Sequence, residues 1–145
     1  MDDIHFYNTN VEWKAGRQGE LSLEGFPTIT VATPPEFPQG VPNTWSPEHL
    51  FVSSANICLM TTFLAIAENS KLKFTSYTAG GTGKMERVEG KYVISEIELK
   101  PRIVIQEEKD KEKALRIIEK AEKGCLISRS MNTKTILNPE IIVQN

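Results

Sequence analysis

The sequence is poor in the residues that most often carry chemistry. Its 145 residues include only two cysteines and two histidines. Neither a Cys-x-x-Cys nor a His-x-x-x-His spacing occurs, so we predict no metal site. The stretch "AGGTGK" also fails the phosphate-binding loop pattern, because Thr78 stands where the first glycine belongs and Met85 follows the lysine.

An excess of charge of one sign is missing too. The chain has 17 basic and 19 acidic side chains and a formal net charge of -2. Such a balance gives no reason to expect nucleic acid as a partner. Charged residues make up 25% and hydrophobic residues 39% of the chain, which is typical of a soluble protein. The length suits a single domain over residues 1–145.

Targeting segments and long hydrophobic runs are also lacking. The N-terminal "MDDIHFYNTN" opens with acidic residues and has no apolar segment, so it does not predict a secretory signal. No apolar run approaches the ~18 residues that span a bilayer. We therefore expect a cytoplasmic protein without a membrane partner, in which thiols stay reduced unless chemistry oxidises them.

The first third of the chain has the pattern of β-strands. Segments 4–13, 19–25 and 28–33 are rich in β-branched and aromatic residues or alternate polar with apolar positions. Between the first two lies "KAGRQGE", whose glycines predict a hairpin turn or short loop around Arg17.

A long helix is predicted from Ser46 to Asn69, after a proline-rich loop. Serine suits the N-cap, Pro47 suits the first helical position, and Glu48 lies where the helix dipole favours an acid. The capping box is incomplete, because His49 stands where glutamate or glutamine would complete it. Apolar residues cover most of the circumference, so we expect this helix to be buried nearly all round, in a core or at a subunit interface.

The second half of the chain predicts a strand pair and further helices. Segment 74–105 indicates two strands with a turn near residues 89–90, and segment 109–124 indicates an amphipathic helix. A short helical turn at 125–131 and strand character at 133–145 follow. The order predicts an α+β domain with an antiparallel sheet and few helices.

Each cysteine has two interpretations. Cys58 lies within the long helix and Cys125 directly follows the second helix. Both could be small buried hydrophobic residues, which is common for free cysteine. Alternatively, the small and polar neighbours of Cys58 could leave an opening beside it. Backbone N–H groups of a helical turn after Cys125 would favour a thiolate.

Arg17 and Glu48 also have two interpretations. Arg17 is either a solvated hairpin tip or a guanidinium that lowers the pKa of a thiolate and holds an oxygen-rich substrate. Glu48 is either a favourable first-turn acid or a carboxylate that orients Arg17 through a bidentate pair.

Several stretches together resemble the OsmC/Ohr family, the osmotically inducible and organic hydroperoxide resistance proteins. "WSPEHLFVSSANICLMTTFLAIAEN" looks like the family's central helix with its peroxidatic cysteine, and "AEKGCLISRSM" looks like its second cysteine motif. "ISEIELKPRIVI" resembles the long strand between them, and "KAGRQGE" resembles the loop that bears the active-site arginine. The family commonly has Cys-Pro at the second motif, whereas here Leu126 follows the cysteine.

The resemblance implies a thiol peroxidase with an OsmC-like fold. Antiparallel sheets, a long buried central helix and a second amphipathic helix would form an intertwined homodimer with active sites at the subunit interface. Cys58 would be the attacking thiolate and Cys125 the resolving thiol, while Arg17 would activate Cys58 and Glu48 would hold Arg17. No metal, flavin or haem is implied, and an external dithiol or lipoyl-type reductant would restore the thiols.

The apolar side chains near Cys58 favour an organic hydroperoxide over hydrogen peroxide as substrate. The candidate substrate-binding residues are Phe51, Leu59, Met60 and Phe63.

Helix geometry gives the dimer separate support. Glu48 and Cys58 are ten residues apart, which is roughly 15 Å of rise along one straight helix. One arginine could hardly contact both within one chain. Two such helices packed antiparallel would bring Glu48 of one protomer toward Cys58 of the other.

Two other functions fit the same sequence. One is an OsmC-like binding or redox-sensing protein with little peroxidase turnover, which the missing Cys-Pro keeps open. The other is a structural or interaction protein with inert buried cysteines.

Overall fold

A computed structural model describes residues 3–144 of the chain. These residues fall into two compact units, one that ends at Leu50 and one that begins at Phe51. The single domain expected from chain length stays a prediction. The first two residues and Asn145, which the expected N-terminal and C-terminal segments include, lie outside the described residues.

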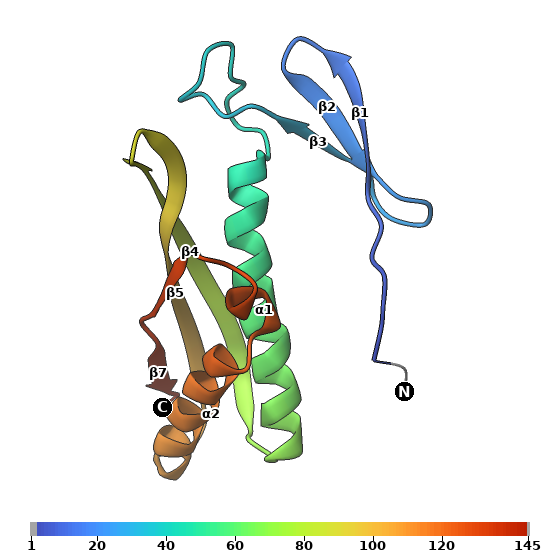
Figure 1. Ribbon diagram of the computed structural model, residues 1–145. Coiled ribbons are helices and arrows are strands. Elements are labelled where there is room, and N and C mark those ends of the chain that lie inside the picture. The colour runs from blue at the N-terminus through green and yellow to red at the C-terminus, as the bar shows by residue number, and fades with distance from the viewer. Residues whose placement is uncertain (1–2, 145) are drawn as a thin grey trace. The chain divides into compact units, whose positions relative to one another are not determined.

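The N-terminal unit contains a three-stranded antiparallel sheet. Its strands are β1 (Asn10–Ala15), β2 (Gln18–Ser22) and β3 (Ile29–Ala32), in that order (Figure 1). The turn between β1 and β2 consists of Gly16 and Arg17. Gly16 has a φ of 54°, a backbone conformation that glycine adopts at little cost. The predicted hairpin is therefore present, with Arg17 at its tip.

The long helix α1 (Pro47–Asn69) starts where the sequence predicts. Ser46 is fully buried, and its hydroxyl accepts a hydrogen bond from the His49 backbone N–H at 3.1 Å. The His49 ring nitrogen Nδ1 lies 2.7 Å from the same hydroxyl. The serine half of a capping box thus forms, and the imidazole contacts the capping oxygen instead of completing the box.

The C-terminal unit is built on a long antiparallel hairpin of β4 (Phe74–Val88) and β5 (Lys91–Ile105). The turn residues Glu89 and Gly90 both have positive φ, at 52° and 80°, as the primed turns of two-residue hairpins require. The predicted turn is at its expected place.

The last segment of the chain forms two short strands. These are β6 (Lys134–Leu137) and β7 (Glu140–Val143), and both pair with β5 in parallel. The predicted antiparallel sheet is therefore confirmed for β4 and β5 and is mixed at this edge. The helical crossover after β5 carries the chain back before it pairs again, and such a return produces parallel pairing.

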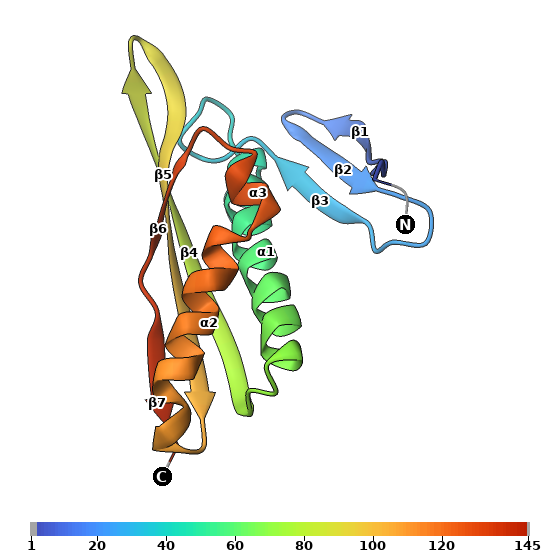
Figure 2. The same ribbon diagram turned by 60° about the horizontal axis from the view of Figure 1, so that its bottom comes forward.

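The helices of this unit lie on one face of its sheet. In Figures 1 and 2, α1 and α2 (Lys111–Lys123) run side by side there, with α2 preceded by the short helix η1 (Glu108–Asp110) and followed by α3 (Leu126–Arg129). The core joins α1, β4, β5, α2 and the segments beside them. Its buried members are Ala55, Leu59, Phe63, Ala67, Leu72, Ile97, Leu99, Ile103, Ile105, Ala114, Ile117, Ile118 and Ala121.

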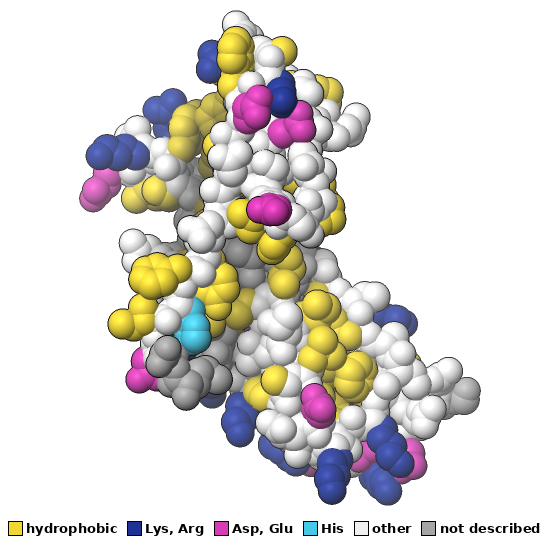
Figure 3. Space-filling model, turned by 90° about the vertical axis from the view of Figure 1, so that its right-hand side faces the viewer, with side chains coloured by type: hydrophobic (Ala, Val, Ile, Leu, Met, Phe, Trp, Pro, Cys, Tyr) yellow, Lys and Arg dark blue, Asp and Glu magenta, His cyan; other side chains and the backbone are white. Residues whose placement is uncertain are grey.

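Only one stripe of α1 is buried in the single chain. Four residues spaced by one helical turn are buried, whereas Ile57 is 56% exposed and Leu64 is 38% exposed. We expected α1 to be buried on nearly all sides. Within one chain it is not, because one sheet covers only one side of a helix. Figure 3 shows hydrophobic side chains exposed on one face of the molecule.

The composition of α1 also corrects the expectation about membrane spans. Over an 18-residue window its mean hydropathy is 1.9, so the helix is long and apolar enough to cross a bilayer by these criteria alone. Serine and threonine interrupt its apolar runs, which is why no continuous run stands out in the sequence. One such helix is weak evidence for a span, because the core helix of a soluble protein passes the same test.

Candidate active site

The two cysteines, far apart in the sequence, lie beside each other in the C-terminal unit. Cys58 is half-buried on α1, Cys125 is 1% exposed just before α3, and both are free thiols. They are near enough for the thiol of each to shift the pKa of the other. Gly124, at the end of α2, lies close to Thr62 of α1: a Cβ atom at Gly124 would be 3.8 Å from the Thr62 methyl carbon. Thr62 is one helical turn after Cys58. The end of α2 thereby places Cys125 near Cys58 of α1.

Cys58 has surroundings that favour its thiolate. Burial acts against the charged form and is the largest single influence. Hydrogen bonds from the Cys125 thiol, the Ile127 N–H, the Thr62 hydroxyl and the Leu126 N–H outweigh it and lower the pKa of Cys58 below its ordinary value. The Thr62 hydroxyl oxygen lies 3.9 Å from the Cys58 sulfur.

Cys125 has the opposite bias. Burial raises the pKa of its thiol, and the hydrogen bond to Cys58 raises it further. The Ser128 hydroxyl donates a hydrogen bond to the Cys125 sulfur at 3.4 Å and partly offsets these influences. Cys58 is therefore the thiol that ionises first, and Cys125 is the thiol that donates to it.

The helical turn after Cys125 forms without a proline. Cys125 has φ −71° and ψ 112°, an extended conformation, and α3 begins at Leu126. Because leucine keeps the backbone N–H that proline lacks, Leu126 adds a donor to the Cys58 sulfur. The departure from Cys-Pro leaves the turn intact.

Arg17 and Glu48 lie in the N-terminal unit. Arg17 is exposed at the hairpin tip, and within residues 3–144 it forms no salt bridge. The Glu48 oxygen Oε1 is buried and has no hydrogen-bond partner among the described residues. The expected bidentate pair between these two side chains is thus not formed within the described chain. Their roles at Cys58 stay a prediction.

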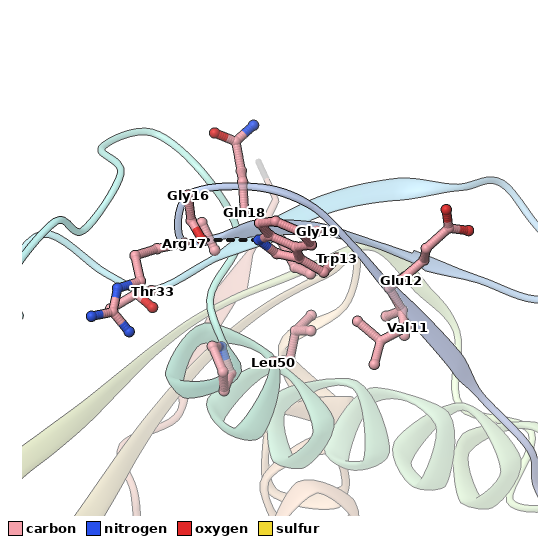
Figure 4. A pocket seen from close by; sticks show the side chains of 13 residues that line it. Val11, Glu12, Trp13, Gly16, Arg17, Gln18, Gly19, Thr33 and Leu50 are labelled. Carbon is pink, nitrogen blue, oxygen red and sulfur yellow. Dashed lines mark hydrogen bonds between the residues drawn. The ribbon is translucent and has the colours of Figure 1, made fainter.

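Arg17 borders an apolar pocket of about 460 Å³ in the N-terminal unit, which Figure 4 shows. The Trp13 indole N–H donates to the Gly16 carbonyl at 3.0 Å and holds the ring beside the hairpin turn. The lining residues are Val11, Glu12, Trp13, Gly16, Arg17, Gln18, Gly19, Leu21, Val31, Ala32, Thr33, Pro47 and Leu50.

The four expected substrate-binding residues divide into two pairs. Phe51 and Met60 are half-buried, so both remain candidates for contact with a substrate. Leu59 and Phe63 are fully buried in the core, and the Phe63 ring centroid lies 5.1 Å from that of Tyr77. Within one chain these two side chains pack the core and have no surface for a ligand.

Sequence reasoning assigned no role to Thr62 and Ser128. Each hydroxyl belongs to a helical turn that also holds a cysteine, at i+4 from Cys58 and at i+3 from Cys125. Helical spacing from each sulfur is the signal that points to them. No group of three His, Cys, Asp or Glu side chains suited to a metal ion occurs among the described residues.

Comparison with known proteins gives a consistent family. Residues 40–140 match the family model described as OsmC-like protein. A protein of Bacillus subtilis (strain 168), the uncharacterized protein YmaD, is 24% identical over 99% of this chain and 97% of its own length.

Solved structures share the fold. An OsmC-like protein of unknown function from Vibrio cholerae superposes with a TM-score of 0.85 at 22% identity, over 94% of this chain and 99% of that one. An organic hydroperoxide resistance protein from Elizabethkingia anophelis superposes with a TM-score of 0.73 at 21% identity, over 97% and 99%. At these identities the structural likeness establishes the fold, α+β with antiparallel and mixed sheets.

Proposed function

The chain belongs to the OsmC-like protein family, and from this premise we propose that it is a cysteine-based thiol peroxidase that reduces organic hydroperoxides. The observation that supports this most is the pairing of two free thiols with opposite pKa shifts. A thiolate attacks a peroxide, and a neutral thiol beside it is placed to resolve the product. Some relatives by fold carry the name of organic hydroperoxide resistance proteins, which agrees with this chemistry.

The reaction has two steps on the protein. The Cys58 thiolate attacks one peroxide oxygen, the O–O bond breaks, and the alkoxide takes a proton and leaves as an alcohol. Cys58 is then a sulfenic acid. Cys125 attacks that sulfur, the S–O bond breaks, and water leaves as the disulfide forms. An external dithiol, of lipoyl type or similar, reduces the disulfide by exchange, so the cycle needs no metal, flavin or haem.

A homodimer would complete the site. Arg17 is exposed and without a salt bridge within residues 3–144, and the Glu48 carboxylate has a buried oxygen without a partner there. Glu48 and Cys58 are roughly 15 Å apart along one helix. The exposed apolar face of α1 at Ile57 and Leu64 is a surface for a second α1. In this proposal, Glu48 and Arg17 of one protomer approach Cys58 of its partner. The protein is proposed to act in the cytoplasm.

Turnover is the test of this function. Purified protein is mixed with cumene hydroperoxide or hydrogen peroxide and a dithiol, and loss of peroxide is followed beside a Cys58→Ser variant. We expect catalytic turnover with a higher kcat/KM for the organic peroxide, and none in the variant. Disulfide formation without turnover would identify a redox sensor instead. Equal or better kcat/KM for hydrogen peroxide would remove the substrate preference.

A further inference from the structure

The burial of Cys125 disfavours the second step, in which its thiolate attacks the Cys58 sulfenic acid. Its side chain is 1% exposed and lies against a second sulfur, and both features raise the pKa of its thiol. To attack the sulfenic acid on Cys58, however, Cys125 must give up its proton, because the thiolate is the nucleophile. A group that stabilises negative charge on the Cys125 sulfur would therefore speed this step.

Ser128 is that group. Its hydroxyl donates to the Cys125 sulfur at 3.4 Å, and its backbone N–H donates to the same sulfur. Both bonds act against the rise in the Cys125 pKa. Hydrogen bonds to a charged acceptor are stronger than those to a neutral one, so the contact strengthens as the thiolate forms.

The turn that carries Ser128 is itself held by backbone bonds. The Arg129 N–H donates to the Cys125 carbonyl at 3.2 Å, and the Ser130 N–H donates to the Leu126 carbonyl at the same distance. Ser128 is half-buried, so water competes little for its hydroxyl. The hydroxyl is thus presented to Cys125 by a fixed backbone.

Two hydroxyls serve the two sulfurs separately. Thr62 contacts Cys58 and Ser128 contacts Cys125. Resting on the proposed peroxidase function, we propose that Ser128 is a positioning residue for the resolving step, in which its hydroxyl stabilises the Cys125 thiolate that attacks the Cys58 sulfenic acid. The S–S bond forms, the S–O bond breaks, and the hydroxide leaves as water with the proton from Cys125.

Rapid-mixing kinetics separates the two steps. Reduced protein is mixed with cumene hydroperoxide, quenched at intervals and weighed by intact mass. In Ser128→Ala we expect sulfenic acid formation at the wild-type rate and disulfide formation slowed about tenfold, so that the one-oxygen adduct accumulates. In Ser128→Ala the rate of disulfide formation should increase with pH, and the midpoint of this increase should lie at a higher pH than in the wild type. Ser128→Thr keeps the hydroxyl and should restore the wild-type rate.

Ser130→Ala is the matched control. Ser130 lies just after α3, and its hydroxyl donates to the Leu126 carbonyl at 2.8 Å. This variant loses a hydroxyl bond to the same helical turn while the Ser128 bond stays, so both steps should keep their wild-type rates. Disulfide formation in Ser128→Ala at the rate of the wild type and of Ser130→Ala would overturn the assignment.

A second measurement does not depend on peroxide. Thiolate absorbance at 240 nm is titrated in a Cys58→Ser background, and the same titration of a Cys58→Ser/Cys125→Ser variant is subtracted to remove the ionisation of the three tyrosines, so that the difference reports Cys125. Adding Ser128→Ala should raise the Cys125 pKa, and adding Ser130→Ala should leave it unchanged. A Cys125 pKa that Ser128→Ala does not move would overturn the role of Ser128, whether or not the wild type reduces peroxides. A wild type inert to peroxide, with the shift still present, would instead remove the peroxidase function.

Discussion

At the scale of single residues, the two thiols differ because their donors differ. Cys58 receives hydrogen bonds from the Cys125 thiol and from two backbone N–H groups in the turn that follows. Cys125 is more deeply buried and faces a sulfur that takes negative charge first. The same short turn therefore favours the thiolate of Cys58 and the neutral thiol of Cys125, and a two-cysteine peroxidase needs one sulfur in each state.

The pH dependence of thiolate formation follows from these shifts. The folded-state pKa of Cys58 is lowered, so its thiolate should form below the pH at which an ordinary cysteine ionises, and peroxide reactivity should fall as the pH drops through that lowered pKa. The stability linked to this ionisation is fully present above the ordinary cysteine pKa and is lost as the pH falls through the lowered one.

Absorbance at 240 nm tests this prediction. The wild type should show a thiol ionisation below the ordinary cysteine pKa, and this ionisation should be missing in Cys58→Ser, where Cys125 ionises at higher pH together with the tyrosines. An early ionisation that survives in Cys58→Ser would reverse the assignment of the two thiols.

Leu126 offers a substitution that removes one N–H and little else. Proline is suited to the first position of a helix, and the extended backbone of Cys125 is the conformation that precedes a proline. Leu126→Pro should therefore fold and raise the Cys58 pKa, with a reaction at neutral pH several-fold slower. Leu126→Ala keeps the N–H and is the control. Equal peroxide rate constants in the two variants would show that this N–H has no part in activating Cys58.

At the scale of elements, the stability of α1 depends on its buried cap. Ser46 is fully buried and its hydroxyl satisfies the His49 N–H. Replacing it with alanine leaves that N–H without its partner, so we expect Ser46→Ala to lower the free energy of unfolding by about 1 to 2 kcal/mol. Urea unfolding measures this.

Ser70→Ala is the comparison, because Ser70 follows the other end of α1 and its side chain forms no hydrogen bond within residues 3–144. It should change the stability by less than about 0.5 kcal/mol. Equal losses in the two variants would mean that the cap contributes nothing specific.

Elements could be predicted from the sequence where residues that are neighbours in the chain determine them. The Ser46-Pro47 start, the Glu89-Gly90 turn and the helical turn after Cys125 follow from residues that are neighbours in sequence, and all three were confirmed. Whether β6 and β7 run parallel to β5 depends on the path of the chain between them, which no local pattern contains.

The candidate site divides in the same way. The family resemblance implied Cys58 and Cys125 as a pair, and in the structure each thiol shifts the pKa of the other. The motifs did not separate Leu59 and Phe63, which pack the core, from Phe51 and Met60, because all four are apolar and lie on the same helix. Which side of a helix meets the core depends on the sheet against which it packs.

At the scale of the whole molecule, apolar surface remains uncovered in one chain. Ile57 and Leu64, seven residues apart on α1, are 56% and 38% exposed. Large exposed apolar residues in groups are typical of an interface. Since the site as proposed is incomplete without a second copy, dimerisation and catalysis should fail together.

Charged substitutions on α1 test that coupling. Ile57→Asp with Leu64→Asp places like charges on the proposed interface, so it should convert a dimer to a monomer by light scattering and reduce peroxidase turnover about tenfold or more, with the helical content by circular dichroism retained. Exposed Val88→Asp on β4, where the side chain is 47% exposed, is the control and should stay dimeric. A wild type that is monomeric at micromolar concentration would contradict the dimer.

The central claim is that Cys58 and Cys125 act as a pair on a peroxide. Its most direct test is the intact mass of the reduced protein before and after one equivalent of cumene hydroperoxide, with Cys58→Ser and Cys125→Ser beside it. We predict a loss of two hydrogens in the wild type, a one-oxygen adduct in Cys125→Ser, and no rapid change in Cys58→Ser. An unchanged wild-type mass would contradict the claim and leave two sulfurs that contact each other without this chemistry.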